Sequence, residues 1–251
     1  MRTELENILL KNRPGFRPVV NFDPAKAKLY HFNFTSSNKE LAQEDLLDTG
    51  HFSRYINTQL KIHDARLGIG GYMEDRVLYK RSQLFNSTDP KSFRNGQNPG
   101  FAGRSVHLGI DIWGPAGTEV FVPVGGVVHS FAFNDNFGDY GATIILQHQL
   151  DTIVFHTLYG HVSLADIAQL QKGKYISRGE KIAHFGDPAE NGSWPPHLHF
   201  QVIGDMNLKE GDYPGVCTID EREKYQHNCP NPDLILNMMQ YAQLPVLQNI
   251  E

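Results

Sequence analysis

Short runs of β-branched and aromatic residues, separated by glycines, fill the chain from Val106 to Ile203 and constrain its fold most strongly. The runs read TEVFVPV, GGVVHSFAF, GATIILQH and TIVFHTLYGH, and KYISRGEKIAHFGD follows them with glycines at its corners. Runs of this composition form strands, and many short strands with glycine turns are typical of sandwiches and barrels. We therefore predict a mainly β fold with a sandwich or barrel-like core.

The chain divides into three parts by composition. Residues 1–95 are mixed and loop-rich, residues 96–205 carry the β pattern, and residues 206–251 form a C-terminal extension that we expect to pack on the core. The boundary is predicted within residues 90–104, which are rich in Gly, Pro and Asn. Short helices are predicted over 38–62 with an interruption at Gly50, over 164–173 and over 233–242, and LGIGGY is predicted to be a turn.

Charge and hydropathy exclude several classes of partner. The 251 residues include 23 Lys and Arg against 28 Asp and Glu, for a net charge of −5, so a nucleic-acid partner is not expected. No apolar run approaches the ~18 residues of a membrane span. The first residues, MRTELENILLKNRPG, hold only a three-residue apolar stretch, which predicts no export signal and favours a cytoplasmic location over an exported one. The sequence does not fix the oligomeric state.

Histidines are concentrated in the β segment. Eight of the 12 lie between His107 and His199. Histidine is the commonest metal ligand and the usual acid–base group near neutral pH. The two cysteines, Cys217 and Cys229, are too few for a disulfide framework, and with His227 they lack an obvious fourth ligand for a second metal.

The motif HLHFQV at residues 197–202 is the sharpest local signal. Side chains at i and i+2 of a strand share a face, so His197 and His199 point together while Leu198, Phe200 and Val202 point into a core. Two imidazoles placed in this way can address one site, as metal ligands or proton carriers.

Two further motifs supply the remaining groups. HLGIDIW holds His107 and Asp111, whose Cα atoms would lie about 13 Å apart in a straight strand. Gly109 between them permits a bend that turns both side chains inward. LYGH places His161 at the end of an apolar strand. Two His and one Asp complete a catalytic zinc set with a fourth position left for water, and two more histidines can move protons, which is the chemistry of amide hydrolysis.

The order HxxxD, YxH, HxH on a glycine-cornered β domain resembles the lysostaphin-like (LytM-type) zinc metalloendopeptidases over about residues 103–205. The resemblance implies an antiparallel two-sheet core with a peptide-binding groove and one zinc ion per chain held by His107, Asp111 and His199. It implies His161 and His197 as catalytic histidines, with the base and stabiliser roles undivided between them. The reaction would be attack of zinc-bound water on an amide of a peptide, such as a peptidoglycan cross-bridge or stem.

Other residues near the motifs are candidates for supporting the ligands or contacting substrate in the groove. They are His148, His156, Tyr140, Tyr159 and Trp194.

The flanking sequences leave alternatives open. ENGSWPPHLHFQ, GDYPGV and CPNPDLIL resemble a subgroup whose domain also occurs fused to aminotransferase-type enzymes, a setting unlike that of a cell-wall hydrolase. The chain could instead be a non-catalytic or latent binding module that retains the fold and metal site and acts on a non-peptidoglycan partner. In that case its extra segments, residues 1–95 and the tail, would block the groove. A lipoyl- or biotinyl-carrier sandwich is a remote third reading, because Lys172, Lys174 and Lys181 do not supply the required context.

Overall fold

The computed structural model describes residues 2–41, 46–86 and 103–243. These residues fold mainly into strands with few, mostly short helices, which confirms the predicted fold class. The strands are β1 (Lys28–Phe32), β2 (Ala65–Gly70), β3 (Val106–His107), β4 (Ile110–Trp113), β5 (Glu119–Phe121), β6 (Gly126–Asn134), β7 (Gly141–Leu150), β8 (Ile153–Val162), β9 (Tyr175–Ile176), β10 (Lys181–His184), β11 (His197–Ile203), β12 (Val216–Cys217) and β13 (Ala242–Gln243). The α-helices are α1 (Glu4–Asn12), α3 (Thr49–Ile62), α4 (Leu164–Ile167), α5 (Arg222–Asn228) and α6 (Asp233–Leu236). The 3-10 helices are η1 (Arg13–Gly15), η2 (Val77–Arg81), η3 (Gln83–Phe85), η5 (Ile219–Glu221) and η6 (Met239–Tyr241).

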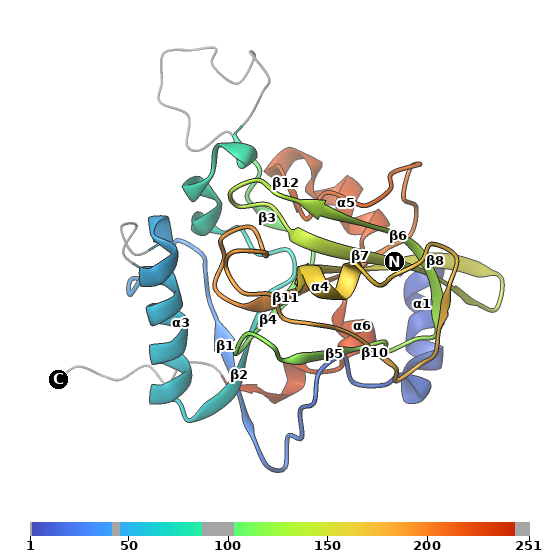
Figure 1. Cartoon of the computed structure of the whole chain (residues 1–251), viewed down its shortest axis with the longest axis horizontal. Coiled ribbons are helices and arrows are strands. Elements are labelled where there is room, and N and C mark those ends of the chain that lie inside the picture. Colours follow the sequence, from blue (N-terminus) through green and yellow to red (C-terminus); the bar gives the residue numbers. More distant parts are fainter. Residues whose placement is uncertain (1, 42–45, 87–102, 244–251) are drawn as a thin grey trace.

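One large mixed sheet organises the molecule, with nine strands in the order β13-β1-β2-β4-β11-β8-β7-β6-β9. Every neighbouring pair from β2 to β9 is antiparallel, as predicted for the core. At the other edge β1 pairs in parallel with both β2 and β13. Both terminal segments therefore extend the sheet beyond the predicted β segment (Figure 1).

The two faces of β11 have different surroundings, as the alternating pattern of HLHFQV predicts. Leu198, Phe200 and Val202 belong to the main hydrophobic core, which the two-stranded sheet of β5 and β10 helps to cover. His197 and His199 lie on the opposite face, where the candidate site is built. Both faces are buried, so β11 is a central strand.

Helix α3 packs beside the N-terminal strands β1 and β2 of the sheet (Figure 1). Its buried residues Phe52, Ile56 and Leu60 recur every four residues and form one apolar stripe. Asp48 caps the helix by accepting a hydrogen bond from the His51 backbone amide at 2.8 Å. The stripe packs on an aromatic cluster that includes Phe32, so the N-terminal segment has its own packed interior against the sheet.

The sequence LGIGGY was predicted to be a turn, and this is wrong because LGIG lies in β2. Gly68 faces Phe32 on the neighbouring strand so closely that a Cβ atom there would lie 2.1 Å from the ring. The glycine therefore makes room for an aromatic ring beside a strand and does not form a turn.

The predicted helices are shorter than the sequence pattern suggested. Helix α3 begins at Thr49, so Gly50 lies in its first turn and does not interrupt it, and residues 42–45 lie outside the described part. Helix α4 ends at Ile167. The C-terminal helix is divided into α6 and η6 because Asn237 adopts a left-handed conformation with φ 52°. The predicted boundary at 90–104 falls almost entirely outside the described residues.

Across the three described stretches, no helix combines the length and apolar character that crossing a membrane requires.

Candidate active site

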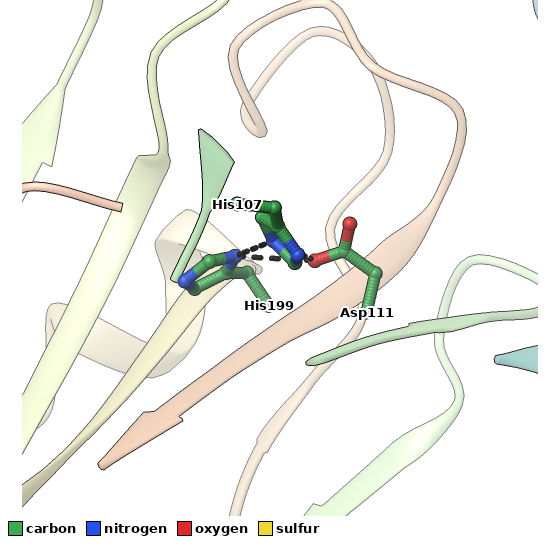
Figure 2. A group of neighbouring side chains, drawn as sticks. All are labelled: His107, Asp111 and His199. Carbon is green, nitrogen blue, oxygen red and sulfur yellow. Dashed lines mark hydrogen bonds and ion pairs between the residues drawn. The ribbon is translucent and has the colours of Figure 1, made fainter. Parts of the chain in front are cut away.

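Three side chains from three strands converge at one point. His107 lies on β3, Asp111 on β4 and His199 on β11, and β4 pairs with β11 in the register that sets Asp111 directly opposite His199. The His199 Nδ1 atom lies 2.9 Å from His107 Nε2 and 3.1 Å from Asp111 Oδ1, and His107 Nε2 lies 3.2 Å from Asp111 Oδ1 (Figure 2). One ligand atom of each residue therefore faces a common centre.

Gly109 makes this convergence sterically feasible. The chain leaves β3 at His107 and enters β4 at Ile110, so the two strands are separated at the glycine, as the predicted bend requires. A Cβ atom on Gly109 would lie 2.5 Å from Cε1 and 2.6 Å from Nε2 of His199. The His199 ring therefore occupies the space that a side chain at position 109 would fill.

Backbone carbonyls fix which nitrogen of each ligand histidine carries the proton. A carbonyl oxygen can only accept, so His107 Nδ1 donates to Gly71 O at 3.0 Å and leaves Nε2 unprotonated. His199 is fixed through Gln201, whose amide nitrogen donates to Pro214 O at 3.1 Å and to Cys229 Sγ at 3.4 Å. The Gln201 Oε1 atom then accepts from His199 Nε2 at 2.9 Å, which leaves Nδ1 unprotonated.

The centre thus has two imidazole lone pairs and a carboxylate oxygen within about one hydrogen-bond length of each other, an arrangement that is repulsive unless a cation lies between them. Burial and the nearby Arg76 guanidinium lower the pKa of His107 to about 3, so a proton does not supply that cation at neutral pH. Burial alone would raise the pKa of Asp111, but His107 and Arg76 hold it well below its usual value. Two His and one Asp are the donor set of a catalytic zinc site, and these residues fit zinc.

His161 reaches the same face of the sheet through a β-bulge. Between β7 and β8 a single residue, Thr143, lies opposite both Gly160 and His161. The His161 backbone is left-handed with φ 62°, which is uncommon for any residue but glycine. Strict alternation would place His161 in the core with Tyr159, whereas the bulge turns it toward His199, with ring centroids 6.3 Å apart.

His197 and His161 form a neutral pair beside the ligand set. Their ring centroids lie 4.1 Å apart, and His197 stacks on Trp113 at 4.0 Å. His161 Nδ1 donates to Asn191 O at 2.8 Å and His197 Nδ1 donates to Pro195 O at 2.7 Å, so both Nε2 atoms are unprotonated. Burial lowers the pKa of His197 to about 4 and that of His161 well below its ordinary value, so both rings are proton acceptors at neutral pH.

A cavity of about 290 Å³ opens onto this group. Asp111, His161, His197 and His199 line it, and so do Tyr140 and Trp194, which were predicted as groove residues. The N-terminal segment contributes a wall of mixed character. The lining residues from that segment are Arg76, Leu78, Tyr79, Leu84 and Phe85.

The structure places the other three predicted support residues elsewhere. His148 and Tyr159 lie on the core side of the sheet, where His148 Nδ1 donates to Gly125 O and the Tyr159 hydroxyl lies 3.2 Å from Thr157 Oγ1. His156 packs edge-on against His129 at 5.0 Å and does not line the cavity. His148 and Tyr159 face the core because β7 and β8 alternate faces, whereas His156 lies five residues before His161 along β8 and so does not reach the cavity.

Two contributors to the site were missed. Gln201 could have been found, because it continues the i, i+2 face of His197 and His199. Arg76 could not, because it lies 35 residues before Asp111 and meets it only in the folded chain, where its Nη1 atom donates to Asp111 Oδ2. The cysteines Cys217 and Cys229 are free and buried, and among the described residues the one candidate metal cluster is His107, Asp111 and His199.

Comparisons with known proteins match the β segment that carries this group of residues. Residues 105–210 match the family model described as Peptidase family M23. The L-Ala–D-Glu endopeptidase of Bacillus subtilis (strain 168) is 26% identical over 138 residues, which are 53% of this chain and 40% of the relative. The chain therefore matches less than half of that relative's length.

Two solved structures are similar over about half of the chain. A zinc-containing peptidase from Vibrio cholerae is 28% identical, with 48% of this chain and 34% of that chain covered and a TM-score of 0.32. The catalytic domain of the antimicrobial peptidase lysostaphin from Staphylococcus simulans is 20% identical, with 49% and 80% covered and a TM-score of 0.33.

The subgroup with fused aminotransferase-type enzymes is not tested by these comparisons and stays a prediction. The family resemblance that HxxxD, YxH and HxH indicate is confirmed. Residues 105–210 of this chain are a peptidase family M23 domain.

Proposed function

We propose that the protein is a zinc-dependent peptidase that hydrolyses an amide bond in a peptide. One observation carries the proposal: three unprotonated ligand atoms face a common centre, and two neutral imidazoles lie beside them at a cavity. His107 Nε2, Asp111 Oδ1 and His199 Nδ1 would hold one zinc ion per chain. Zinc bound there would polarise the amide carbonyl and lower the pKa of a water toward about 7.

His161 and His197 supply the proton transfers in this proposal. Each has a free Nε2 atom, so either can take a proton from the attacking water and return it to the leaving amine. Protonation strengthens the Nδ1–H bonds to Asn191 O and Pro195 O, which stabilise the imidazolium. Because the rings are 4.1 Å apart, two positive charges would repel strongly, and the pair carries one proton at a time.

The relative from Bacillus subtilis suggests which amide to test first. Its name gives the L-Ala–D-Glu bond as its target. We propose a peptide of this class, supplied as soluble peptidoglycan fragments or intact peptidoglycan, as the substrate. Tyr140 and Trp194 line the cavity and would contact the bound peptide.

The test is cleavage by the full chain with zinc, followed as new amino groups and identified by mass spectrometry. Wild type should cleave, a chelator should stop cleavage, and added zinc should restore it. Asp111→Ala should be inactive with zinc present. His129→Gln, a change outside the cavity lining, is the matched control and should cleave like wild type. Cleavage that survives the chelator or Asp111→Ala would contradict the proposal.

A second candidate is a binding module that holds zinc without turnover. The observation in its favour is that residues of the N-terminal segment, Arg76, Tyr79 and Phe85 among them, wall the cavity. In the same assay this candidate predicts intact peptides in every sample. Wild type would still bind zinc, and its binding of peptide would be detected by calorimetry.

A further inference from the structure

Arg76 is a fully buried cation at the candidate metal centre, and it comes from outside the matched family segment. Its side chain is 1% exposed. The Nη1 atom donates to Asp111 Oδ2, and the Nε atom donates to Glu74 Oε2 at 2.8 Å. Arg76 lies just after β2, whose residue Gly70 pairs with Asp111 in the sheet. The sheet register therefore brings this arginine to the side of Asp111 that faces away from His107 and His199.

The backbone holds the segment that carries Arg76 firmly against β3. Met73 N donates to His107 O at 2.8 Å, His107 N to Glu74 O at 3.0 Å, and Arg76 N to Ser105 O at 2.9 Å. Glu74 is fixed in turn, because its Oε1 atom accepts from Phe34 N at 3.1 Å. Backbone hydrogen bonds therefore hold Arg76 beside β3, and its side chain is held between Glu74 and Asp111.

The two oxygens of Asp111 have separate partners. Oδ1 faces His107 Nε2 and His199 Nδ1, at the point where the ligand atoms converge. Oδ2 accepts from Arg76 on the far side. A carboxylate without such a partner can turn and bind a metal through both oxygens, which raises the coordination number and fills the position that water or substrate needs.

We propose that Arg76 is a positioning residue of the metal centre, which limits Asp111 to ligation through one oxygen and keeps a coordination position open. This inference rests on the proposed zinc function. Gly71, in the same segment, fixes the His107 tautomer through its carbonyl. Residues 71–76 therefore support two of the ligand residues, His107 and Asp111. The N-terminal segment is thus a part of the site and does more than block the cavity.

Cobalt(II) in place of zinc gives a readout other than activity, because four-coordinate cobalt absorbs visible light several-fold more strongly than five- or six-coordinate cobalt. The variants are made on Glu74→Gln, since removing Arg76 alone would leave a second buried acid unpaired. Glu74→Gln alone leaves Arg76 on Asp111 and should keep the wild-type spectrum. Adding Arg76→Met should reduce the absorption several-fold, and adding Arg76→Lys, which keeps a cationic donor group beside Asp111, should restore most of it.

Arg81→Met is the control for loss of stability alone. Arg81 is also buried, but it donates to Thr49 Oγ1 and Ser193 O and touches no ligand residue. Its variant should melt at a lower temperature with an unchanged cobalt spectrum, and circular dichroism would establish that each variant is folded.

The outcomes separate the two proposals. If wild type binds no cobalt or zinc, the proposed function fails and this inference fails with it. If wild type gives the four-coordinate spectrum and the folded Glu74→Gln/Arg76→Met variant gives the same spectrum, the metal site stands and the positioning role of Arg76 is overturned.

Discussion

Replacing Gln201 by Met should weaken zinc binding and destabilise the fold, although Gln201 touches no metal. Gln201 is 0% exposed and makes three hydrogen bonds, to His199 Nε2, Pro214 O and Cys229 Sγ. Methionine has a similar length and no amide. The substitution therefore removes the amide that pairs with His199 and Pro214 while nearly conserving volume. The Tyr140 hydroxyl, 3.5 Å from His199 Nε2, is too distant to replace the Gln201 bond at 2.9 Å.

The magnitude follows from those partners. The His199 Nε2–H and the Pro214 carbonyl are both left without a strong partner in the interior, and each such group costs about 1–3 kcal/mol. The free energy of unfolding should fall by about 2–6 kcal/mol, a large share of the roughly 5–15 kcal/mol of a typical domain. Without the Gln201 acceptor, His199 is no longer held with Nδ1 unprotonated, and zinc affinity should fall about 10- to 100-fold.

Urea unfolding of the zinc-free protein and competition with a chromogenic chelator measure the two effects. Gln149→Met is the matched control, because Gln149 lies exposed on β7 and its side-chain amide donates to the nearby Asp151 O at 3.1 Å. The control should change stability by less than about 0.5 kcal/mol and leave zinc affinity unchanged. A folded Gln201→Met protein with wild-type zinc affinity would refute the role given to this amide.

Three further predictions use other features of the site and sheet. Gly109→Ala should weaken zinc binding at least about tenfold in the chelator competition, since its Cβ would meet the His199 ring, and wild-type affinity would contradict the steric argument. His161→Ala should keep zinc by elemental analysis but lower kcat about 10²- to 10⁴-fold, whereas loss of zinc would make it a ligand. Burial lowers the pKa of His148 to about 4, below the 6.5 of the unfolded chain. Between these two pH values the unfolded state binds more protons than the folded state. The free energy of unfolding therefore falls as the pH is lowered from 6.5 toward 4. Zinc-free wild type should therefore lose about 1.4 kcal/mol per pH unit more than His148→Gln in urea unfolding over that window, and equal slopes would show that His148 is not buried as a neutral ring.

The sequence predicted the parts of the site that depend on strand alternation and chain order. HLHFQV alone indicates which side chains face the core, and the structure agrees, with Leu198 and Phe200 in the core and His199 at the candidate centre. The HxxxD motif with its glycine also predicts the bend between His107 and Asp111. These features are local, so a few residues of sequence are enough to specify them.

The features that the sequence could not predict depend on contacts between distant residues or on unusual backbone conformation. His161 faces the site only because a bulge and a positive φ reverse the alternation of β8. Arg76 reaches Asp111 only because β2 pairs with β4. Gly68 was placed in a turn because glycine favours turns, whereas Phe32, 36 residues earlier, explains its place in a strand.

The zinc content of purified protein, measured by elemental mass spectrometry after saturation and removal of free metal, tests the central claim most directly. Asp111→Ala is the partner variant, because it removes the Oδ1 ligand atom from the cluster. We predict about one zinc per chain in wild type and almost none in the variant. No zinc in wild type after reloading, or equal zinc in both proteins, would contradict the claim that His107, Asp111 and His199 form a metal centre.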